Sequence, residues 1–443
     1  MVKKVKFQTP TGMHDILPQE QKYFKKIYDT VESIVNFYGF EKIDTPILEN
    51  AELFSRGVGL NTDIVEKEMY VLKTKGGDIL ALRPEGTAPV VRAFIENGMN
   101  NMPQPVKLWY WGPYFRYEKP QADRFRQFWQ FGIEVFGENS PEIEAQVIQV
   151  LYNILTELKF KDLVIEVNSI GDSQCRPYYK KLLVSYLRSR ESSLCGDCKR
   201  RIKINPLRVL DCKEEKCQRI KAQAPQLIDH LCEECHSHFK EVLEFLDEMG
   251  LPYRLNPYLV RGLDYYTKTV FEIFSLENFE AKGDPSKKVE GVGEEKIGKS
   301  ALVGGGRYDS LVKLLGGRDT PGCGAGGGIE RIIRLMKNKD IKLPQAPQPV
   351  IFMAQIGTSA KRKSLKLFEE FRKAKINVSE SFSKDSLKAQ LRIADKLEVQ
   401  YTLIIGQKET LEGTVIVRDM KTGRQETIKI DKAIEEMKER LKK

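Results

Sequence analysis

Residues 106–136 read VKLWYWGPYFRYEKPQADRFRQFWQFGIEVF, a stretch that is dense in aromatic side chains. Aromatic residues favour the half-buried, pleated surface of a sheet, so the two ends of this stretch predict two β-strands. The polar segment KPQADR between them contains a proline and predicts a connecting loop. We therefore expect a strand, a loop and a second strand in that order.

Arginines and a glutamate gather where the first of these strands meets the loop. Arg116 and Glu118 belong to the sequence FRYE, and Arg124 and Arg126 follow in RFRQF. The forked guanidinium group of Arg matches two phosphate oxygens at once, whereas Lys acts as a point charge. This pattern predicts a site for a phosphate whose charge changes during a reaction. A ladder of surface ion pairs between the strands is the alternative.

Helices and further strands are predicted on both sides of this stretch. Apolar residues at helical spacing predict a helix over 18–38, and a strand follows over 40–48, where Pro46 restricts it to the edge of a sheet. A strand and then a helix are predicted over 79–98, with LRPEGTAP at their junction. The remaining predictions are helices over 141–160, 176–190 and 329–337 and strands over 258–275 and 300–304.

The last hundred residues have a pattern of their own. The prolines of KLPQAPQP, residues 342–349, predict a stiff linker, and strands alternate with helices beyond it. That alternation predicts an α/β layer on a largely parallel sheet. Residues 348–443 carry 21 Lys and Arg against 14 Asp and Glu, which is +7 of the chain's net charge of +10. A basic terminal domain suggests contact with a polyanion, although a lysine-rich solvated surface gives the same count.

Length and composition exclude several classes of protein. A chain of 443 residues is too long for one compact core and fits two or three domains. Its 41% hydrophobic and 30% charged residues are typical of a globular rather than a disordered protein. No run approaches the ~18 apolar residues that span a membrane, and the start MVKKVKFQTP lacks the apolar segment of a secretory signal. We therefore expect a cytoplasmic protein with no membrane partner.

Six of the eight cysteines fall between Cys195 and Cys235. In a chain with no export signal, they are expected to be thiols or metal ligands rather than disulfides. The pairs Cys195-x-x-Cys198 and Cys232-x-x-Cys235 could together hold a structural zinc ion through four thiolates. Against this, 33 residues separate the two pairs, which exceeds the usual spacing, and two further cysteines intervene. A small helical module with buried thiols is the alternative.

A run of glycines over 322–328 predicts a turn that leads into the helix over 329–337. It matches the pattern G-x-G-x-x-G, but a turn precedes it and no βαβ unit follows, which argues against a dinucleotide-binding fold. Glycines here would instead let a flat ligand such as adenine approach the backbone, with Arg331 covering its exposed face. Tight packing of a helix on a sheet is the alternative. The four histidines form no catalytic dyad, and His236 and His238 are expected at the surface unless they join the cysteines as ligands.

Three of these segments, in this order, resemble the signature motifs of the class II aminoacyl-tRNA synthetases: residues 39–46, the FRYE region, and the glycine run before Arg331. Two more segments narrow the resemblance to the histidyl-tRNA synthetase family. Residues 259–266, LVRGLDYY, are similar to the first of its two histidine-specific signatures, and residues 304–309, GGGRYD, are similar to the second. The resemblance extends over nearly the whole chain.

The resemblance implies a fold and a division into domains. It implies an α+β catalytic core on an antiparallel sheet over 1–337, interrupted by a small helical insertion domain over 173–250. A linker over 338–347 then leads to a C-terminal α/β anticodon-binding domain over 348–443. Residues 39–46 would form the seam of a homodimer, and an ordinary edge strand is the alternative.

The resemblance also implies a reaction and its residues. Members of the family join L-histidine to ATP, which carries Mg²⁺, and pass the histidyl group to tRNA(His). Arg116 and Arg261 would be the catalytic residues that grip the α-phosphate. ATP would be bound by Arg116, Glu118, Arg124 and Arg331. Histidine would be bound by Glu85, Gly86, Thr87, Arg116, Gln130, Glu134, Arg261, Tyr265 and Tyr266. No side chain is implied as a metal ligand.

Two further points follow from the resemblance. The family's insertion domain leans on the acceptor arm of the tRNA, which the basic run 199–201 would suit; a solvated helix face is the alternative. The main rival function is that of a non-catalytic paralogue, the regulatory subunit of ATP phosphoribosyltransferase in histidine biosynthesis. That paralogue lacks the anticodon-binding domain and has lost catalytic arginines, whereas this chain keeps both. The polar segment 277–299 is longer than the family's usual connection.

Overall fold

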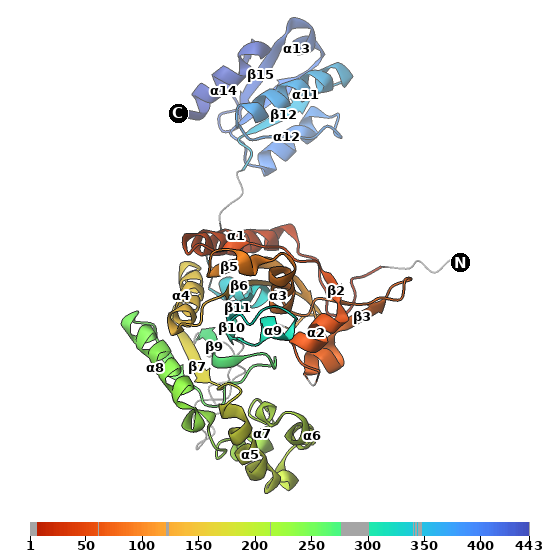
Figure 1. Ribbon diagram of the computed structural model, residues 1–443. Coiled ribbons are helices and arrows are strands. Elements are labelled where there is room, and N and C mark those ends of the chain that lie inside the picture. Colours follow the sequence, from red (N-terminus) through yellow and green to blue (C-terminus); the bar gives the residue numbers. More distant parts are fainter. Residues whose placement is uncertain are drawn as a thin grey trace, which may run out of the picture. The chain divides into compact units, whose positions relative to one another are not determined.

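The computed structural model describes residues 7–60, 62–120, 124–212, 214–275, 301–339, 341, 343 and 348–442 (Figure 1). The chain divides into two compact units, Met1–Leu343 and Pro344–Lys443. The long segment 277–299 lies outside the described residues, and so do residues 344–347 of the linker. Among the residues that are described, no helix is long and apolar enough to cross a membrane.

An eight-stranded sheet forms the body of the first unit, in the strand order β1-β5-β6-β11-β10-β9-β7-β8. The aromatic stretch supplies β5 (Val106–Phe115) and β6 (Gln127–Phe136), which pair antiparallel along their whole length. Among the described strands of this sheet, only the outer pairs β1–β5 and β7–β8 are parallel, so the expected antiparallel core is confirmed. The other strands are β1 (Glu41–Lys42), β7 (Leu163–Ser169), β8 (Tyr253–Leu255), β9 (Thr267–Ser275), β10 (Val303–Arg307) and β11 (Gly322–Gly328).

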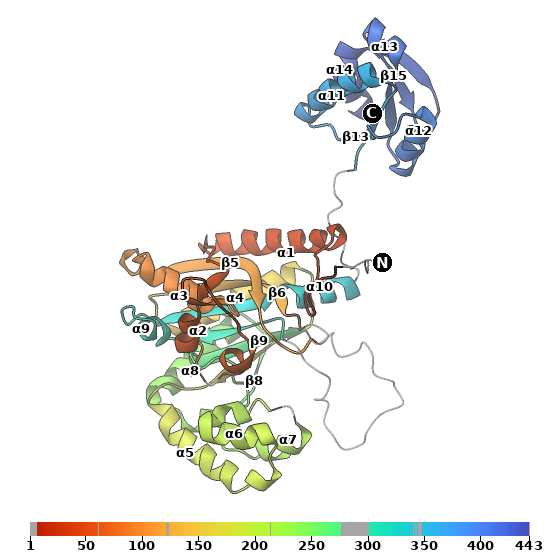
Figure 2. The ribbon, with the colours of Figure 1, turned by 90° about the vertical axis from the view of Figure 1, so that its right-hand side faces the viewer.

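Four helices pack on one face of this sheet and bury its apolar side chains. In α1, the residues Phe24, Ile27, Val31 and Val35 recur on one side of the helix, and all four are buried. This helix lies along the sheet (Figure 2). The four helices are α1 (Pro18–Phe37), α4 (Pro141–Glu157), α8 (Glu233–Glu248) and α10 (Ile329–Asn338).

The opposite face of the sheet faces smaller elements: a three-stranded sheet in the order β2-β4-β3 and three short helices. The two-residue period of a strand decides which side chains point there. In β6, Phe131 and Ile133 lie in the helix-covered core, whereas Glu134 is bonded to Thr87 on the other face. These elements are β2 (Leu48–Asn50), β3 (Tyr70–Lys73), β4 (Ile79–Leu82), α2 (Ala51–Gly57), α3 (Thr87–Glu96) and α9 (Leu311–Leu314).

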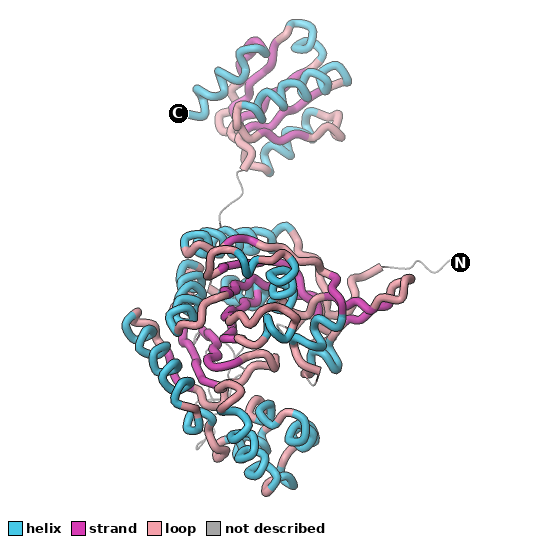
Figure 3. The backbone as a smooth tube through the Cα atoms, viewed as in Figure 1, coloured by secondary structure: helices cyan, strands magenta, loops and turns pink. Residues whose placement is uncertain are grey.

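The insertion between β7 and β8 is helical, as expected. Its described residues form helices and turns without a strand (Figure 3). The helices are α5 (Cys175–Arg188), α6 (Gly196–Ile204) and α7 (Glu215–Lys221), followed by α8 of the core. Its buried side chains, among them Tyr179, Leu183 and Leu187 of α5, belong to the same apolar cluster as the side chains on the face of the large sheet opposite the four helices.

The second unit is an α/β layer on a five-stranded sheet in the order β13-β12-β14-β15-β16. β13, β12 and β14 are parallel, but β15 and β16 are antiparallel to their neighbours. The expectation of a largely parallel sheet is therefore correct for three strands only, because the last two follow short connections that cannot cross over the sheet. The elements are β12 (Ile351–Gln355), α11 (Thr358–Lys373), β13 (Val378–Glu380), α12 (Leu387–Lys396), β14 (Tyr401–Ile405), α13 (Gln407–Glu412), β15 (Thr414–Asp419), β16 (Gln425–Lys429) and α14 (Ala433–Lys442).

The glycine run over 322–328 was predicted as a turn, and that prediction is wrong. It forms β11, which lies between β6 and β10. The reason is the space left by the neighbouring strands. A Cβ atom at Gly324 would lie 1.8 Å from Glu134 Oε2, and one at Gly327 would lie 2.5 Å from the ring of Phe131. Only glycine lets these strands approach while β6 keeps its large side chains.

The first histidine signature also differs from its prediction. It falls in the predicted strand 258–275, but β9 begins only at Thr267, and residues 259–266 form a loop before it. The carbonyl of Leu259 accepts a hydrogen bond from the side-chain amide of Asn168, and the backbone amide of Asp264 donates to the carbonyl of Val58. The loop is therefore fastened to the core on both sides of Arg261.

Candidate active site

A cavity of about 180 Å³ lies at the ends of β6, β10 and β11. Its lining combines arginines with glutamates and bare glycine backbone. The charged and polar residues are Arg116, Glu118, Arg124, Gln130, Arg261, Glu272, Glu330 and Arg331. A second cavity of about 410 Å³ shares Arg116, Glu118, Arg124 and Arg331 with it and extends toward the insertion. All four residues predicted to bind ATP thus lie together, with Arg261 beside them.

Arg116 follows β5 and is held from several sides. Its Nε atom donates to the carbonyl of Pro84 at 2.9 Å, and its guanidinium group lies 5.3 Å from the ring centroid of Phe128. Its Nη1 atom is 3.9 Å from Glu118 Oε1. Glu118 also accepts from Arg124 Nη1 at 2.9 Å. These contacts hold the arginine in place at the junction of the two cavities.

Arg261 comes from the loop over 259–266 and forms an ion pair with Glu272 of β9. Its guanidinium group also lies 5.7 Å from the ring centroid of Tyr266. A Cβ atom at Gly304 would lie 2.4 Å from Arg261 Nη1, so the guanidinium group rests on strand backbone that only glycine leaves bare. Burial lowers the pKa of Arg261, but the carboxylate of Glu272 together with Tyr265 and Tyr266 more than offsets this, and the net direction is upward. The group is positively charged at all ordinary pH values.

Arg331 stands in the first turn of α10, directly after the glycine strand β11. Its Nη1 atom donates to the carbonyl of Ala301 at 2.9 Å. Gly328 lies beneath its stem, since a Cβ atom there would meet Arg331 Cδ at 3.7 Å. The strand and helix therefore aim this arginine over bare backbone, where a flat ring could lie.

The turn before α3 carries the predicted residues Glu85, Gly86 and Thr87. Glu85 is buried, and its carboxylate accepts backbone N–H bonds from Thr87 and Ala88, both at 2.8 Å. Burial raises the pKa of Glu85, and these two amides partly oppose the rise. A Cβ atom at Gly86 would lie 2.5 Å from the ring of Tyr110, so glycine is needed for this close approach.

Glu134 of β6 is fully buried and accepts three hydrogen bonds from side chains. The hydroxyl of Thr87 donates to it at 2.8 Å and that of Tyr110 at 3.0 Å, and Tyr308 also donates. Burial raises the pKa of Glu134 to about 8, although these hydrogen bonds oppose the rise. The carboxyl group therefore holds a proton at neutral pH, which is unusual for a glutamate.

The two tyrosines of the loop, Tyr265 and Tyr266, are buried, and their rings lie next to each other at a tilt near this group. The ring centroids of Tyr265 and Tyr266 are 4.7 Å apart, and that of Tyr308 is 5.7 Å from Tyr265. The hydroxyl of Tyr265 donates to Glu85 at 3.3 Å. Gln130 lies near the start of β6 and lines the smaller cavity. Five of the residues predicted to bind histidine are thus linked to one another and to Arg261, namely Glu85, Thr87, Glu134, Tyr265 and Tyr266.

Comparisons with known proteins agree with this arrangement. The family described as histidyl-tRNA synthetase matches residues 12–174 and 200–332. This chain belongs to the histidyl-tRNA synthetase family. The second unit matches the family described as anticodon binding domain over residues 348–440.

Relatives are similar to nearly the whole length of this family member. A protein of Halothermothrix orenii named histidine–tRNA ligase is 44% identical, over 97% of this chain and 98% of the relative. A protein of the same name from Dehalococcoides mccartyi is 42% identical, over 98% and 100%. The crystal structure of apo S. aureus histidyl-tRNA synthetase has a TM-score of 0.75 and 33% identity, over 97% of this chain and 99% of that one.

Sequence reasoning missed three side chains that complete this histidyl-tRNA synthetase site. Glu272 pairs with Arg261, and Tyr110 and Tyr308 donate to Glu134. Signals for two of them were present. Glu272 is the single acidic residue in the apolar strand TKTVFEIFS, and Tyr308 belongs to the second histidine signature but was given no role. Tyr110 has no signal, since one more aromatic residue in an aromatic strand predicts only packing.

His238 was expected at the surface or among the cysteines, and both expectations are wrong. It is buried on α8, where its Nε2 atom lies 2.5 Å from Glu144 Oε2. Glu144 also accepts from Arg307 Nη2 at 2.9 Å. Arg307, from the second signature, therefore joins β10 to α4 and α8 and does not reach the cavity. A strand arginine facing a helix is indistinguishable in sequence from one facing a ligand.

The zinc grouping considered from the sequence is also wrong. The sulfur and oxygen atoms gather in two separate groups, each containing one of the two Cys-x-x-Cys pairs. One is Cys195, Cys198, Cys212 and Cys217, and the other is Asp172, Cys175, Cys232 and Cys235. The pairs start different helices, α6 and α8, and each meets cysteines from the segment folded against it.

Two residues of the basic run 199–201, Arg200 and Arg201, form ion pairs with the catalytic core. Arg201 Nη2 lies 3.3 Å from Asp63 Oδ2, and Arg200 Nη1 lies 3.3 Å from Glu66 Oε2. Arg208 adds a bond of 2.6 Å to Asp63. These arginines therefore join the insertion to the core, which the sequence interpretation as a tRNA contact did not foresee.

Proposed function

We propose that this chain is a histidine–tRNA ligase. A carboxylate oxygen of L-histidine attacks the α-phosphorus of ATP, histidyl-adenylate forms, and pyrophosphate leaves. A hydroxyl at the 3′ end of tRNA(His) then attacks the adenylate carbonyl, and AMP leaves. The observation that carries the proposal is that Arg261, from the family's first histidine signature, lines the same cavity as Arg116 and Arg331.

Arg116 and Arg261 are the proposed catalytic residues. Two anions, a carboxylate and a phosphate, must meet, and further negative charge develops on the phosphoryl oxygens. Preorganised cations lower such a barrier because they need not reorient during the reaction. Arg116 would contact the α-phosphate from the β5–β6 hairpin and Arg261 from the loop beside β10. Phe128 and Glu272 hold the two guanidinium groups before any substrate binds.

The remaining charged residues of the cavity would bind the rest of the nucleotide. Arg331 would cover the adenine and reach the γ-phosphate, and Glu118 with Arg124 would complete the site. Mg²⁺ would enter with the ATP phosphates and neutralise part of their charge. The donor set fits this ion, since the carboxylates of Glu272 and Glu330 line the cavity and Mg²⁺ prefers oxygen ligands.

Histidine would bind in the group of residues beside Arg261. Glu85 and Thr87 would hold its α-amino group on the turn closed by Gly86, and Gln130 and Glu134 would meet the amino group and the imidazole. Tyr265 and Tyr266 would close over the ring, with Arg116 and Arg261 near the carboxylate. Such a pocket rejects isosteric amino acids because they leave its own buried polar groups unpaired. The positively charged α-amino group of bound histidine, placed beside Glu134, would lower the pKa of this carboxyl group and favour loss of its proton.

The second unit, residues 348–443, is the proposed reader of the tRNA(His) anticodon. It carries +7 of the chain's net charge, which favours a polyanion. Its match to anticodon binding domains supports this role. The proposed domains keep the boundaries implied by the resemblance, with a catalytic core over 1–337, an insertion over 173–250 and a linker over 338–347.

The proposed assembly is a cytoplasmic homodimer joined through residues 39–46. β1 is at the edge of the large sheet, and exposed apolar side chains lie near it. Phe37 is 85% exposed, and Ile47 and Leu48 are exposed as well. Burying these side chains against a second copy would remove apolar surface from water.

The rival function, a regulatory subunit without catalysis, is not favoured. It would need neither the arginines of the cavity nor a tRNA-reading domain, and this chain has Arg116, Arg261 and Arg331 together with residues 348–443. Charging of tRNA tests the choice directly. The purified protein should attach labelled histidine to tRNA in the presence of ATP and Mg²⁺ and should not attach other amino acids. A protein that charges no tRNA but stimulates ATP phosphoribosyltransferase would support the rival.

A further inference from the structure

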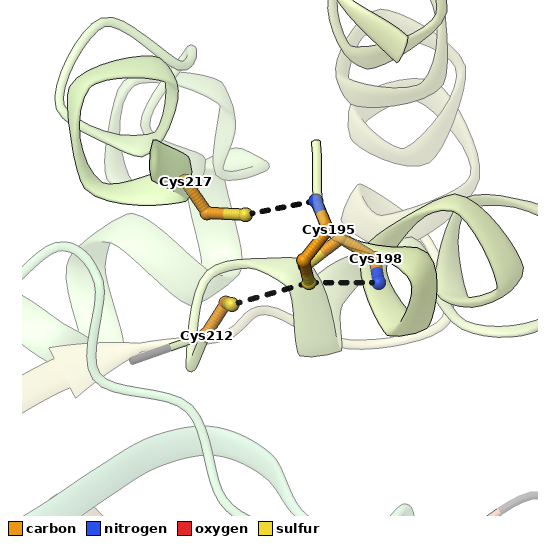
Figure 4. Close-up of side chains that lie close together, drawn as sticks. All are labelled: Cys195, Cys198, Cys212 and Cys217. Carbon is orange, nitrogen blue, oxygen red and sulfur yellow. Dashed lines mark hydrogen bonds between the residues drawn. The ribbon is translucent and has the colours of Figure 1, made fainter. Parts of the chain in front are cut away.

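A cluster of four thiols lies in the insertion, outside the residues assigned to the reaction. The sulfur atoms of Cys195, Cys198, Cys212 and Cys217 all lie within 4.8 Å of one another. Figure 4 shows Cys212 and Cys217 pointing toward Cys195 from separate segments. Cys195 Sγ and Cys212 Sγ are 3.8 Å apart, which is far beyond the ~2.05 Å of a disulfide bond. All four are free thiols.

This spacing is that of one tetrahedral metal ion. Zinc binds thiolate sulfur at about 2.3 Å, and two corners of such a tetrahedron are then about 3.8 Å apart. The Sγ–Sγ distance between Cys195 and Cys212 in this structure has this value, and the other pairs lie within 4.8 Å. An iron–sulfur cluster also takes four cysteines, but it divides them among two or four iron atoms and so spreads the sulfurs further. The geometry points to a single ion.

The backbone around the cluster is arranged as it is around metal-bound thiolates. The amide of Cys198 donates to Cys195 Sγ at 3.4 Å, and the amide of Cys195 donates to Cys217 Sγ at 3.3 Å. Such N–H bonds orient the ligands and stabilise sulfur that carries negative charge. All four cysteines are buried, and several thiolates gathered away from water need a cation among them.

We propose that Cys195, Cys198, Cys212 and Cys217 bind one structural Zn²⁺. The ion would tie the start of α6 to α7 and to the loop that leads into it, in a part of the insertion built of short helices. Between these ends lie Asn205 and Arg208. Asn205 donates to Asp264 at 2.8 Å within the first histidine signature, and Arg208 pairs with Asp63. The zinc ion therefore fixes the part of the insertion that braces the active-site loop.

A second, independent group supports a second ion. Asp172, Cys175, Cys232 and Cys235 also have ligand atoms within 4.8 Å of one another. The amide of Cys232 donates to Cys175 Sγ at 3.1 Å. This group joins the start of α5 to the start of α8, where the chain enters and leaves the insertion. One oxygen of Asp172 already accepts two amide bonds, so its other oxygen is the ligand of a site with three sulfurs and one oxygen.

Metal content of the full-length protein tests both sites. After growth in zinc-supplemented medium and purification without chelator, inductively coupled plasma mass spectrometry should find two zinc ions per chain. Cys198→Ser should lower this to one by removing the first site, and Cys235→Ser should lower it to one by removing the second. Cys323→Ala is the matched control, because Cys323 is also a buried thiol but belongs to neither group, and it should retain two ions.

The two proposed zinc sites can be contradicted independently of each other. Wild-type protein with less than a tenth of an equivalent of zinc, or with iron in its place, overturns both. A Cys198→Ser protein with unchanged zinc overturns the first site, and an unchanged Cys235→Ser protein overturns the second. If either variant does not fold, zinc-edge X-ray absorption of the unmodified protein decides. Sulfur at about 2.3 Å as the dominant neighbour supports the sites, and a shell of oxygen and nitrogen alone contradicts them.

Discussion

Glu272 in the middle of strand β9 forms an ion pair with Arg261 in the loop that precedes the strand. Both residues line the cavity that also contains Arg116. A strand is among the most rigid parts of the fold, so its carboxylate sets the position of a guanidinium group that is carried by a loop. The sheet thus holds one of the two arginines that are proposed to stabilise the transition state.

Replacing Arg261 by Ala should lower the rate of histidyl-adenylate formation by about 10²–10³-fold, because a preorganised charge that stabilises the transition state is lost. Single-turnover kinetics with saturating ATP and histidine measure this rate. Arg56→Ala is the matched control, since Arg56 is exposed on α2, lines neither cavity and forms an ion pair with Glu52 one turn away. Near-normal adenylate formation in the Arg261 variant would remove this residue from the mechanism.

Glu134 gives the protein's stability a specific pH dependence. Burial raises its pKa from 4.5 to about 8, so between these values the native state keeps a proton that the unfolded chain has lost. Its contribution to stability is complete below pH 4.5 and is lost as the pH rises through 8. Glu134→Gln cannot lose a proton, so its free energy of unfolding relative to wild type should rise between pH 5 and 8, on the order of a few kcal/mol.

Denaturant unfolding of both proteins at several pH values measures this difference. Glu142→Gln provides the control, because Glu142 is exposed on α4 and its replacement should leave the pH dependence unchanged. A difference between the Glu134 variant and wild type that stays constant from pH 5 to 8 would show that Glu134 titrates normally.

Arg208 and Asp63 join the insertion to the core at 2.6 Å, and both side chains are partly buried. Removing either partner should weaken this contact, and the double variant should lose little more than the single ones. A double-mutant cycle of Arg208→Ala and Asp63→Asn should therefore give a coupling free energy of about 1–3 kcal/mol. Additive effects of the two substitutions on the free energy of unfolding would mean that the contact does not hold the insertion.

Removing residues 348–443 should separate the two steps of the reaction. The shortened protein keeps the whole cavity, because that cavity is formed by the first unit alone. Adenylate formation should change less than tenfold, whereas kcat/KM for tRNA charging should fall by about 10²-fold or more as the basic unit's contacts are lost. Equal losses in both steps would contradict a separate tRNA-reading unit.

Much of this architecture could be predicted because its signals are local. The aromatic strands β5 and β6 and the helix α1 follow from periods of two and 3.6 residues, which depend on the chain's own sequence. The glycine strand β11 could not be predicted in this way. Its glycines leave room for the side chains of Glu134 and Phe131 on the neighbouring strand. Such a fit between strands cannot be recognised from the local sequence.

In the candidate site, too, some residues could be predicted from local sequence and others could not. Arg261 was predicted from a specific signature and Arg116 from a degenerate motif that gained weight beside it, but the partners that position these two arginines come from distant segments. The cysteines illustrate this most clearly. Spacing alone grouped Cys195 with Cys232, whereas the fold brings Cys195 to Cys212 and Cys232 to Cys175. Pairing among distant residues is a property of the tertiary structure, which sequence spacing does not determine.

The central claim is that the arginine-lined cavity activates histidine with ATP. Exchange of labelled pyrophosphate into ATP, measured with each amino acid in turn, tests it most directly. The account predicts rapid exchange with L-histidine, none above background with the other amino acids, and loss of the histidine-dependent exchange in Arg261→Ala. Exchange that another amino acid drives equally well, or no exchange with histidine, would contradict it.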